Sequence, residues 1–359
     1  MRLLAIESSC DETAAAVVLA EGSEIRILSN IVASQVDVHR LYGGVVPEIA
    51  SRAHVEALSR ITYAALEQAG VSVGSLDGVA VTDHPGLIGA LLCGVNFAKS
   101  LAVNAHLPII PVDHIKGHIA AAYLARDGYT PPKPPFIALV VSGGHTSIYH
   151  VTSYTEHTLI GSTRDDAMGE AFDKIGRLIG IPYPAGAGFD ALAREGFTET
   201  VGDTENYFAA YAKSAARRDP QLKLPSPALT DGSYDFSFSG LKTAAINLLH
   251  RFEQQAIPLP LAAFAARYTF EAVEAVATHL SAVLTAYPDC DLVLCGGVAA
   301  NSHLRHRLSV LTEKLHRGFF VPPPSLCGDN AAMIAAAGYF AALKGAFGDS
   351  SLNACAADF

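Results

Sequence analysis

Two histidines, His114 and His118, stand four positions apart in the segment D-H-I-K-G-H of residues 113–118. On a helix, residues i and i+4 share a face, so both imidazoles could bind one metal ion. The apolar run of residues 107–113 predicts a strand leading into the pair, and ligand sites in α/β proteins favour such strand ends. In a chain with 14 histidines this spacing also arises by chance, so ordinary surface or core histidines explain the pair alone equally well.

A third metal ligand must come from another part of the chain, and Asp329 is the candidate. It lies in the segment PPPSLCGDNAAM (residues 322–333), between a proline-rich loop and an alanine-rich stretch that predicts a helix. The alternative is that Asp329 or Asn330 simply caps this helix, since both residue types are favoured caps. Two polar residues in tandem at one helix start leave room for a ligand and a cap together.

Two glycine turns follow apolar strands and could bind a nucleotide. In VVSGGHT (residues 140–146), a Ser-Gly-Gly turn can present bare backbone to a phosphate or an adenylate, although an ordinary hairpin turn is an equal alternative. In LCGGVAANSHLR (residues 294–305), a helix start and Asn301 could bind an anion or a nucleoside, with helix capping as the alternative. Asp173, on a predicted helix, and Gly186, in the Pro/Gly loop after it, could face the same cleft. The chain has no G-x-x-x-x-G-K-[ST] motif, so any nucleotide is held in another way.

The predicted elements around these motifs form two similar halves. Residues 3–19 and 136–151 each have an apolar run, a small polar turn and a second apolar run, which predicts two hairpins from a duplicated domain. Helices are predicted at residues 47–70, 90–106 and 266–287, and strands at residues 76–83, 107–113 and 291–297. This alternation predicts an α/β protein with a two-lobed actin-like ATPase fold, in which duplicated α/β domains surround a central cleft.

The lobe boundary is expected at the stiff linker TPPKPP, residues 130–135. The N-terminal lobe would then be residues 1–130, with the histidine pair, and the C-terminal lobe residues 131–359, with the nucleotide-contacting loops. Residues 195–234 are polar and weakly periodic, which predicts an excursion from the core of the second lobe. The basic run of this excursion, with Lys213, Arg217 and Arg218, could contact tRNA phosphates or form an ordinary solvated loop face.

The composition limits the class of protein. Half of the 359 residues are hydrophobic, which predicts a sizeable core, and the formal net charge is −10. Such an acidic chain is a poor stand-alone nucleic-acid binder, so an RNA substrate would require a local basic surface or a partner. The six cysteines are scattered and form no C-x-x-C pair, the N-terminus does not resemble a signal peptide, and the apolar tract of residues 331–343 is too short to span a bilayer. These features predict a cytoplasmic protein that has no membrane partner.

Taken together, the motifs are more specific than any one alone. Eight segments occur in the order seen in the TsaD family of tRNA N6-adenosine threonylcarbamoyltransferases: IESSCDETAAAV, GGVVPEIASRAHVE, DHIKGH, VVSGGHT, GEAFDK, FSFSGLKTA, GGVAAN and GDNAAM. The chain resembles this family over nearly its whole length. The resemblance implies an actin-like fold and transfer of a threonylcarbamoyl group from L-threonylcarbamoyladenylate to N6 of the adenosine 3′ of the anticodon. The tRNAs concerned read codons that begin with A, and AMP is released.

The resemblance also implies the site residues. His114, His118 and Asp329 would bind one metal ion per chain, Fe²⁺ or Zn²⁺. Nine residues would contact the rest of the ligand: Val140, Val141, Ser142, Gly143, Gly144, Asp173, Gly186, Asp190 and Asn301. The resemblance assigns no catalytic residue; Glu12, beside Asp11 in the first hairpin turn and near the phosphates in such folds, is the candidate. The implied partners are tRNA, a TsaB-like protein that is a shorter relative of this fold, and a TsaE-like small ATPase, while a TsaC-like enzyme makes the adenylate.

The sequence departs from the family pattern at four places. The segment Pro184–Gly188 reads P-A-G-A-G where the family has Pro-Gly-Gly-Pro, and His84 stands before Pro85 where the family has glycine. The residues before Asp329 and Asn330 are Leu-Cys-Gly where the family has Tyr-Cys-Thr. The excursion of residues 195–234 is roughly twenty residues longer than is typical of the family. The placement of the loop that carries Gly186 is the expectation most affected.

Two other functions fit parts of the pattern. A kinase or ATPase with an actin-like fold would turn over ATP with Mg²⁺ and would not need a histidine-bound metal, and fold alone does not exclude it. A metallopeptidase of the H-E-x-x-H type would need a glutamate after the first histidine as general base, and that position is Ile115. The peptidase is therefore the weaker alternative.

Overall fold

The computed structural model describes residues 1–227, 229 and 231–357, and the chain forms two compact units. Unit 1 comprises Met1–Phe136, Val151–Thr158 and the segment from Phe320 onward, and unit 2 comprises Ile137–His150 and Leu159–Phe319. The first passage between the units lies next to the expected linker. The segment from Phe320 onward, which the sequence analysis placed in the second lobe, belongs instead to unit 1, because its helix packs on the first sheet.

Unit 1 is built on a five-stranded sheet of order β3-β2-β1-β4-β5. Strand β1 pairs antiparallel with β2 and parallel with β4, which in turn pairs parallel with β5. Its strands are β1 (Arg2–Glu7), β2 (Glu12–Glu21), β3 (Glu24–Ser34), β4 (Gly78–His84) and β5 (Ile109–Asp113). Its helices are α1 (Val36–Arg40), α2 (Pro47–Ala69), η1 (Val73–Ser75), α3 (Ile88–Ala105), α4 (His114–Ala120), η2 (Ala121–Tyr123), η6 (Pro324–Leu326) and α11 (Ala331–Leu343).

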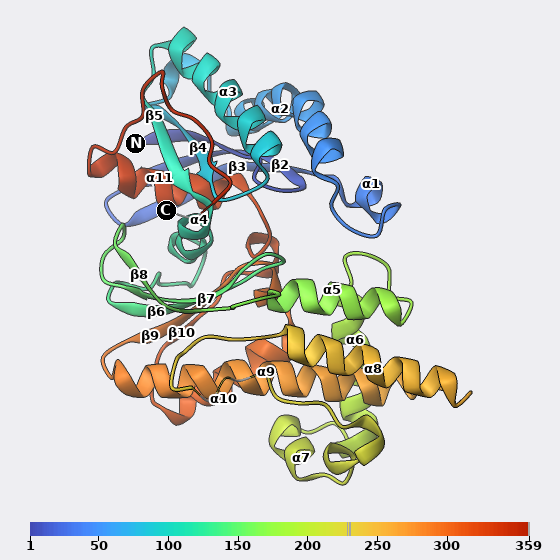
Figure 1. The fold of residues 1–359 in the computed structure, drawn as a ribbon. Coiled ribbons are helices and arrows are strands. Elements are labelled where there is room, and N and C mark those ends of the chain that lie inside the picture. Colours follow the sequence, from blue (N-terminus) through green and yellow to red (C-terminus); the bar gives the residue numbers. More distant parts are fainter. Residues whose placement is uncertain (228, 230, 358–359) are drawn as a thin grey trace. The chain divides into compact units, whose positions relative to one another are not determined.

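Helices cover both faces of this sheet (Figure 1). Alternate strand residues such as Leu4, Ile6 and Val81 form one core cluster with Leu58 of α2 and Val95 of α3. Successive side chains of a strand point to opposite faces, so the intervening residues meet α11 on the other side. There Gly338 of α11 lies so close to Ala80 and Val112 that an added Cβ would be 2.7 Å from the Ala80 Cβ.

Helix α3 is long and apolar enough to cross a membrane when judged by length and composition alone. Its mean hydropathy over 18 residues is 1.4. The sequence patterns did not indicate this helix as a candidate membrane span. Buried residues Val95, Ala98 and Ala102 of this helix belong to the core cluster of unit 1. Packing in the core therefore accounts for the apolar residues on the buried face of this helix, which is 33% buried.

Unit 2 contains most of a second sheet, of order β10-β9-β6-β7-β8. The strands are β6 (Phe136–Val141), β7 (Thr146–Val151), β8 (His157–Ser162), β9 (Asp291–Cys295) and β10 (Phe319–Phe320). The helices are α5 (Met168–Leu178), α6 (Gly186–Val201), α7 (Tyr207–Lys213), η3 (Ala216–Arg218), η4 (Pro220–Leu222), α8 (Ser239–Gln254), α9 (Leu261–Ala286), η5 (Gly297–Ala300) and α10 (Ser302–Lys314). The two predicted hairpins correspond to β1–β2 and β6–β7.

The expected polar excursion, residues 195–234, packs buried aromatic residues against the helices of unit 2, so the prediction that it leaves the core was wrong in character. Of this stretch, residues 228 and 230 lie outside the described residues. Phe208 and Tyr211 of α7 are buried and contact Phe197 of α6 and Phe270 of α9. Aromatic residues spaced irregularly in a polar segment give little periodic signal, although together they form a core.

The loop before α5 is tied to the start of α8 by Asp166. Its carboxylate forms ion pairs with Lys174 of α5 and Lys242 of α8 and accepts a hydrogen bond from the Ser239 hydroxyl. Burial raises the pKa of Asp166, but the hydrogen bonds from Lys174, Lys242 and Ser239 outweigh burial and lower the pKa to about 2. The contact joins two motifs noted in the sequence, GEAFDK and FSFSGLKTA.

Replacing Asp166 with asparagine should therefore make stability depend less on pH. A carboxyl group whose pKa is lowered on folding stabilises the protein above its unfolded pKa near 4, and this contribution is lost as the pH falls toward 2. We expect the variant to lose about 1 kcal/mol of unfolding free energy at pH 7, the scale of partly exposed ion pairs, and to converge with the parent as the pH approaches 2. Urea unfolding at several pH values measures this, with exposed Asp203→Asn as the control. A loss that is the same at every pH would contradict the prediction.

Candidate active site

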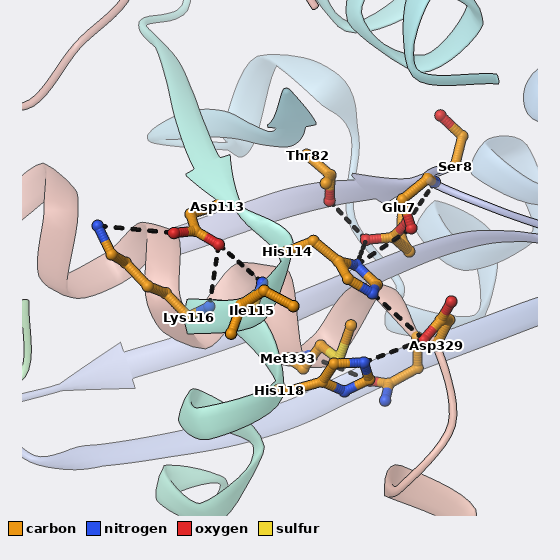
Figure 2. A network of polar contacts seen from close by, with 12 residues as sticks. Glu7, Ser8, Thr82, Asp113, His114, Ile115, Lys116, His118, Asp329 and Met333 are labelled. Atoms are coloured by element: carbon orange, nitrogen blue, oxygen red, sulfur yellow. Dashed lines mark hydrogen bonds and ion pairs between the residues drawn. The ribbon is translucent and has the colours of Figure 1, made fainter. Parts of the chain in front are cut away.

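The histidine pair lies where strand β5 ends and helix α4 begins. Asp113 caps α4, because its carboxylate accepts hydrogen bonds from the backbone N–H groups of Ile115 (2.7 Å) and Lys116 (3.2 Å). His114 and His118 are both buried on one face of α4, with ring centroids 4.6 Å apart (Figure 2). The predicted i, i+4 geometry is therefore present.

Asp329 completes this cluster from the start of α11. The neighbouring residue Asn330, and not Asp329, caps this helix, because its side-chain oxygen accepts a hydrogen bond from the N–H of Met333 at 3.0 Å. The Asp329 carboxylate instead approaches the histidines: Oδ1 is 3.5 Å from Nε2 of His114 and 3.2 Å from Nε2 of His118 (Figure 2). All three residues offer a ligand atom within 4.8 Å of one another.

The three side chains fit a transition-metal ion. Two imidazole nitrogens and one carboxylate oxygen are a common ligand set for such ions, and the Asp329 oxygen lies 3.5 and 3.2 Å from the two Nε2 atoms. His118 is fully buried, and among the described residues its Nδ1 has no hydrogen-bond partner, while Nε2 lies against the Asp329 carboxylate at 3.2 Å without making a hydrogen bond. Burial lowers the pKa of His114, but the charges of Asp329 and Glu7 outweigh burial and raise it to about 9. The local field therefore favours a positive charge at this cluster.

Behind His114 lies Glu7, which sequence reasoning missed. It ends strand β1, is fully buried, and places Oε2 3.1 Å from Nδ1 of His114. Ser9 N–H and the Thr82 hydroxyl donate hydrogen bonds to the Glu7 carboxylate (Figure 2). A carboxylate on the far nitrogen of a metal-binding histidine fixes the ring and its tautomer. The sequence feature that could have indicated this role is a glutamate at the end of an otherwise apolar strand.

Replacing Glu7 with glutamine should weaken metal binding about 10- to 100-fold, because the His114 ring loses the anion that orients it. Competition with a chelator of known affinity, at constant pH, measures this in the folded variant. Glu48→Gln, on the exposed surface of α2, is the control and should leave metal affinity unchanged. An unchanged affinity in folded Glu7→Gln would show that packing and the Ser9 hydroxyl, 3.1 Å from Nδ1, hold the ring without this negative charge.

Glu12, the candidate for a catalytic role, begins strand β2. The Ser34 hydroxyl donates to its carboxyl group at 3.3 Å. Burial, with the negative charges of Asp329 and Asp11, raises the pKa of Glu12 to about 9. The raised pKa favours the protonated form of this carboxyl group over the ionised form that a general base requires.

In unit 2, the turn after strand β6 presents unpaired backbone donors. Val140 and Val141 are fully buried in the strand, and Ser142 closes the turn by a reciprocal pairing with His145. Gly143 and Gly144 are exposed, and their N–H groups donate to no group within the described residues. Successive free N–H groups of this kind form an anion-binding concavity.

The other four predicted ligand contacts lie around helices α5, α6 and α10 of unit 2. Asp173 of α5 accepts the N–H of Ala185 at 2.7 Å. Gly186 is the first residue of α6 and is not in a loop, which corrects the expectation for this segment. The cause is local: Ala185 itself already has helical backbone angles, φ of −80° and ψ of −13°, so the residues that follow extend α6.

Asp190 and Asn301 lie on either side of the junction between α6 and α10. Both carboxylate oxygens of Asp190 accept hydrogen bonds from Ser302, one from its N–H and one from its hydroxyl, at 2.8 Å each. Asn301 caps α10 by accepting the N–H of Leu304 at 2.8 Å. The structure thus joins Asp190 to Asn301 through the start of one helix, and both side chains have structural partners there.

Comparison with known proteins agrees with this arrangement. The family model for TsaD, tRNA N6-adenosine threonylcarbamoyltransferase, matches residues 26–336. Proteins of that name from Clostridium perfringens and Geobacillus thermodenitrificans are 44% and 46% identical to this chain. Each match covers 98% of this chain, and 96% and 95% of those proteins respectively.

Solved structures agree at the level of the fold. Full-length HypF, in a phosphate- and nucleotide-bound form, has a TM-score of 0.57 at 15% identity over 98% of this chain and 47% of its own. HypF of T. kodakarensis has a TM-score of 0.59 at 13% identity, over 96% of this chain and 48% of its own. Both likenesses support the predicted actin-like ATPase fold. The extent of the sequence matches identifies this chain as a member of the TsaD family, the tRNA N6-adenosine threonylcarbamoyltransferases.

Proposed function

We propose that the chain transfers the threonylcarbamoyl group of L-threonylcarbamoyladenylate to N6 of the adenosine 3′ of the anticodon, in tRNAs reading codons that begin with A. The observation that carries this proposal is the buried cluster of His114, His118 and Asp329, supported by Glu7, in a chain that matches TsaD proteins over nearly its whole length. A kinase-like ATPase would have no use for such a cluster.

The adenosine amine attacks the carbamoyl carbonyl carbon of a mixed anhydride that is already activated. A C–N bond forms, the bond from that carbon to the phosphate oxygen breaks, AMP leaves and N6 loses a proton. No covalent enzyme intermediate is needed. We assign His114, His118 and Asp329 to one Fe²⁺ or Zn²⁺ ion, which would supply a Lewis acid that stabilises developing charge on the carbonyl oxygen.

The chain's own groups in unit 2 would hold the adenylate. The free N–H groups of Gly143 and Gly144, next to Val140, Val141 and Ser142, suit the phosphate of AMP. The polar side chains of Asp173, Asp190 and Asn301, with the exposed Gly186 at the start of α6, would contact the nucleoside. Ribose hydroxyls can take the place of the Ser302 hydroxyl on the Asp190 carboxylate, since both donate hydrogen bonds to an anion.

Partners complete the proposed reaction. We propose that a TsaB-like protein and a TsaE-like ATPase assist this chain in the cytoplasm, because its net charge of −10 gives little grip on RNA. The basic run of residues 213–218 contributes less than its sequence suggests. Arg217 is paired with the buried Glu271 at 3.0 Å, which leaves Lys213 and Arg218 as the exposed cations of this run.

One assay tests the function. The purified chain is incubated with L-threonylcarbamoyladenylate and unmodified tRNA, with and without the TsaB-like and TsaE-like proteins, and the nucleosides are analysed by mass spectrometry. Formation of threonylcarbamoyladenosine supports the proposal. Steady ATP hydrolysis with no modified nucleoside, when all partners are present, would support the kinase-like alternative instead.

A further inference from the structure

A series of hydrogen bonds links Tyr207 of α7 to Asp190 in unit 2. The hydroxyl of Tyr207, at the start of α7, lies 2.8 Å from Nδ1 of His303 in α10. Nε2 of His303 lies 3.0 Å from the backbone oxygen of Asp190 in α6. His303 is fully buried, so both ring nitrogens depend on these partners.

The direction of each hydrogen bond in this series follows from the backbone oxygen of Asp190, which is the acceptor at one end. A backbone carbonyl oxygen only accepts hydrogen bonds. Nε2 of His303 therefore carries a hydrogen and donates it in a hydrogen bond to the backbone oxygen of Asp190. Burial lowers the pKa of His303, although the neighbouring Asp190 raises it, so the ring is neutral and Nδ1 is an acceptor. Burial raises the pKa of Tyr207, so its phenol keeps its proton and donates to Nδ1.

The side chain of Asp190 makes further hydrogen bonds. The carboxylate of Asp190 holds both the N–H and the hydroxyl of Ser302, the residue after Asn301. His303, the residue after Ser302, contacts the backbone oxygen of the same aspartate. Tyr207 is therefore linked to the Asp190–Asn301 pair through one buried histidine.

The Tyr207 ring is held independently of its hydroxyl. It stacks on His306, with ring centroids 4.5 Å apart and planes inclined by 21°, and contacts Phe197 at 5.2 Å. Replacing Tyr207 with phenylalanine would therefore remove one hydrogen bond and leave the packing of the ring in place.

We propose that Tyr207 is a positioning residue for the adenylate, which acts through His303 on the Asp190–Asn301 pair. The proposal rests on the proposed function, in which Asp190 and Asn301 contact the nucleoside. It assigns a role in substrate binding to a segment that the sequence indicated only as an excursion. Without the Tyr207 hydroxyl, Nδ1 of His303 is unsatisfied, and the ring can turn away from Asp190.

The test compares steady-state kinetics of two tyrosine variants in the complete reaction with tRNA and partners. Tyr207→Phe should raise KM for L-threonylcarbamoyladenylate about tenfold, with kcat, KM for tRNA and metal content unchanged. Tyr211→Phe is the matched control on the same helix, because its hydroxyl makes no hydrogen bond within the described residues. It should change every parameter less than twofold. Equal kinetics for Tyr207→Phe and the parent would overturn the proposal.

Variants of His303 separate positioning from simple structural support. Glutamine can place a donor near Nε2 and keep the bond to Asp190, whereas asparagine reaches only the Nδ1 position. His303→Gln should retain most of the adenylate affinity, and His303→Asn should lose it. Equal losses in both variants would count against the proposal.

Asp190→Ala separates this inference from the function on which it rests. If Asp190→Ala leaves KM for the adenylate unchanged, both the assignment of Asp190 and the inference fail. If Asp190→Ala raises KM while Tyr207→Phe does not, only the inference fails.

Discussion

Asp329→Asn is expected to lower threonylcarbamoyl transfer at least about a hundredfold and to leave the purified protein without the metal ion that we propose for this site. The amide removes the negative charge of the ligand that lies within 3.5 Å of both histidine Nε2 atoms. Elemental analysis and nucleoside mass spectrometry measure the two losses.

The neighbouring residue supplies the matched control. Asn330→Ala removes the cap of α11 and should cost about 1 kcal/mol of unfolding free energy while the metal is retained. The two adjacent variants thus have opposite expected results: one loses metal and keeps the helix cap, and the other loses the cap and keeps metal. Wild-type metal content in Asp329→Asn would remove Asp329 from the ligand set.

Gly296→Ala should destabilise the protein by about 2–4 kcal/mol. Gly296 follows strand β9 with φ of +91°, a conformation that residues with a Cβ rarely adopt. An added Cβ would also overlap the backbone oxygen of Val141 at the end of β6. Because Val141 leads into the turn of Gly143 and Gly144, the protein that still folds should also bind the adenylate more weakly. Urea unfolding and adenylate affinity measure these effects.

Gly297→Ala is the control for this substitution. Gly297 has an ordinary φ, and an added Cβ would meet nothing within 4 Å, so the change should stay within about 0.5 kcal/mol. Equal losses in the two variants would mean that general flexibility of the Gly-Gly turn, rather than close approach of β9 and β6, determines its stability.

Sequence patterns predicted those parts of the fold that depend on local chemistry. Helix α2 was expected at residues 47–70 and ends at Ala69, because Gly70 adopts the left-handed cap conformation with φ of 66°. The histidine pair on α4 was expected for the same kind of reason, since i, i+4 spacing and a strand end are both local features. The resemblance to the TsaD family rested on eight such local motifs.

The features that were not predicted depend on contacts between distant segments. Nothing near Glu7 in the sequence indicates that its carboxylate lies beside His114, which is more than a hundred residues away. The return of the segment from Phe320 to unit 1 depends on the fit of Gly338 against Ala80, which a one-sequence pattern does not show. The aromatic packing around Phe197 was missed because its members come from α6, α7 and α10.

Unit 1 is discontinuous, because the whole of unit 2 is encoded between its pieces. During synthesis, Glu7, His114 and His118 emerge from the ribosome first, followed by all of unit 2. Asp329 and helix α11, which covers the first sheet, emerge only afterwards. A nascent chain therefore carries a half-built unit 1 with one bare sheet face while unit 2 folds, a state that suits binding by a chaperone. The three proposed metal ligands are therefore all present only in the last stage of translation or after release.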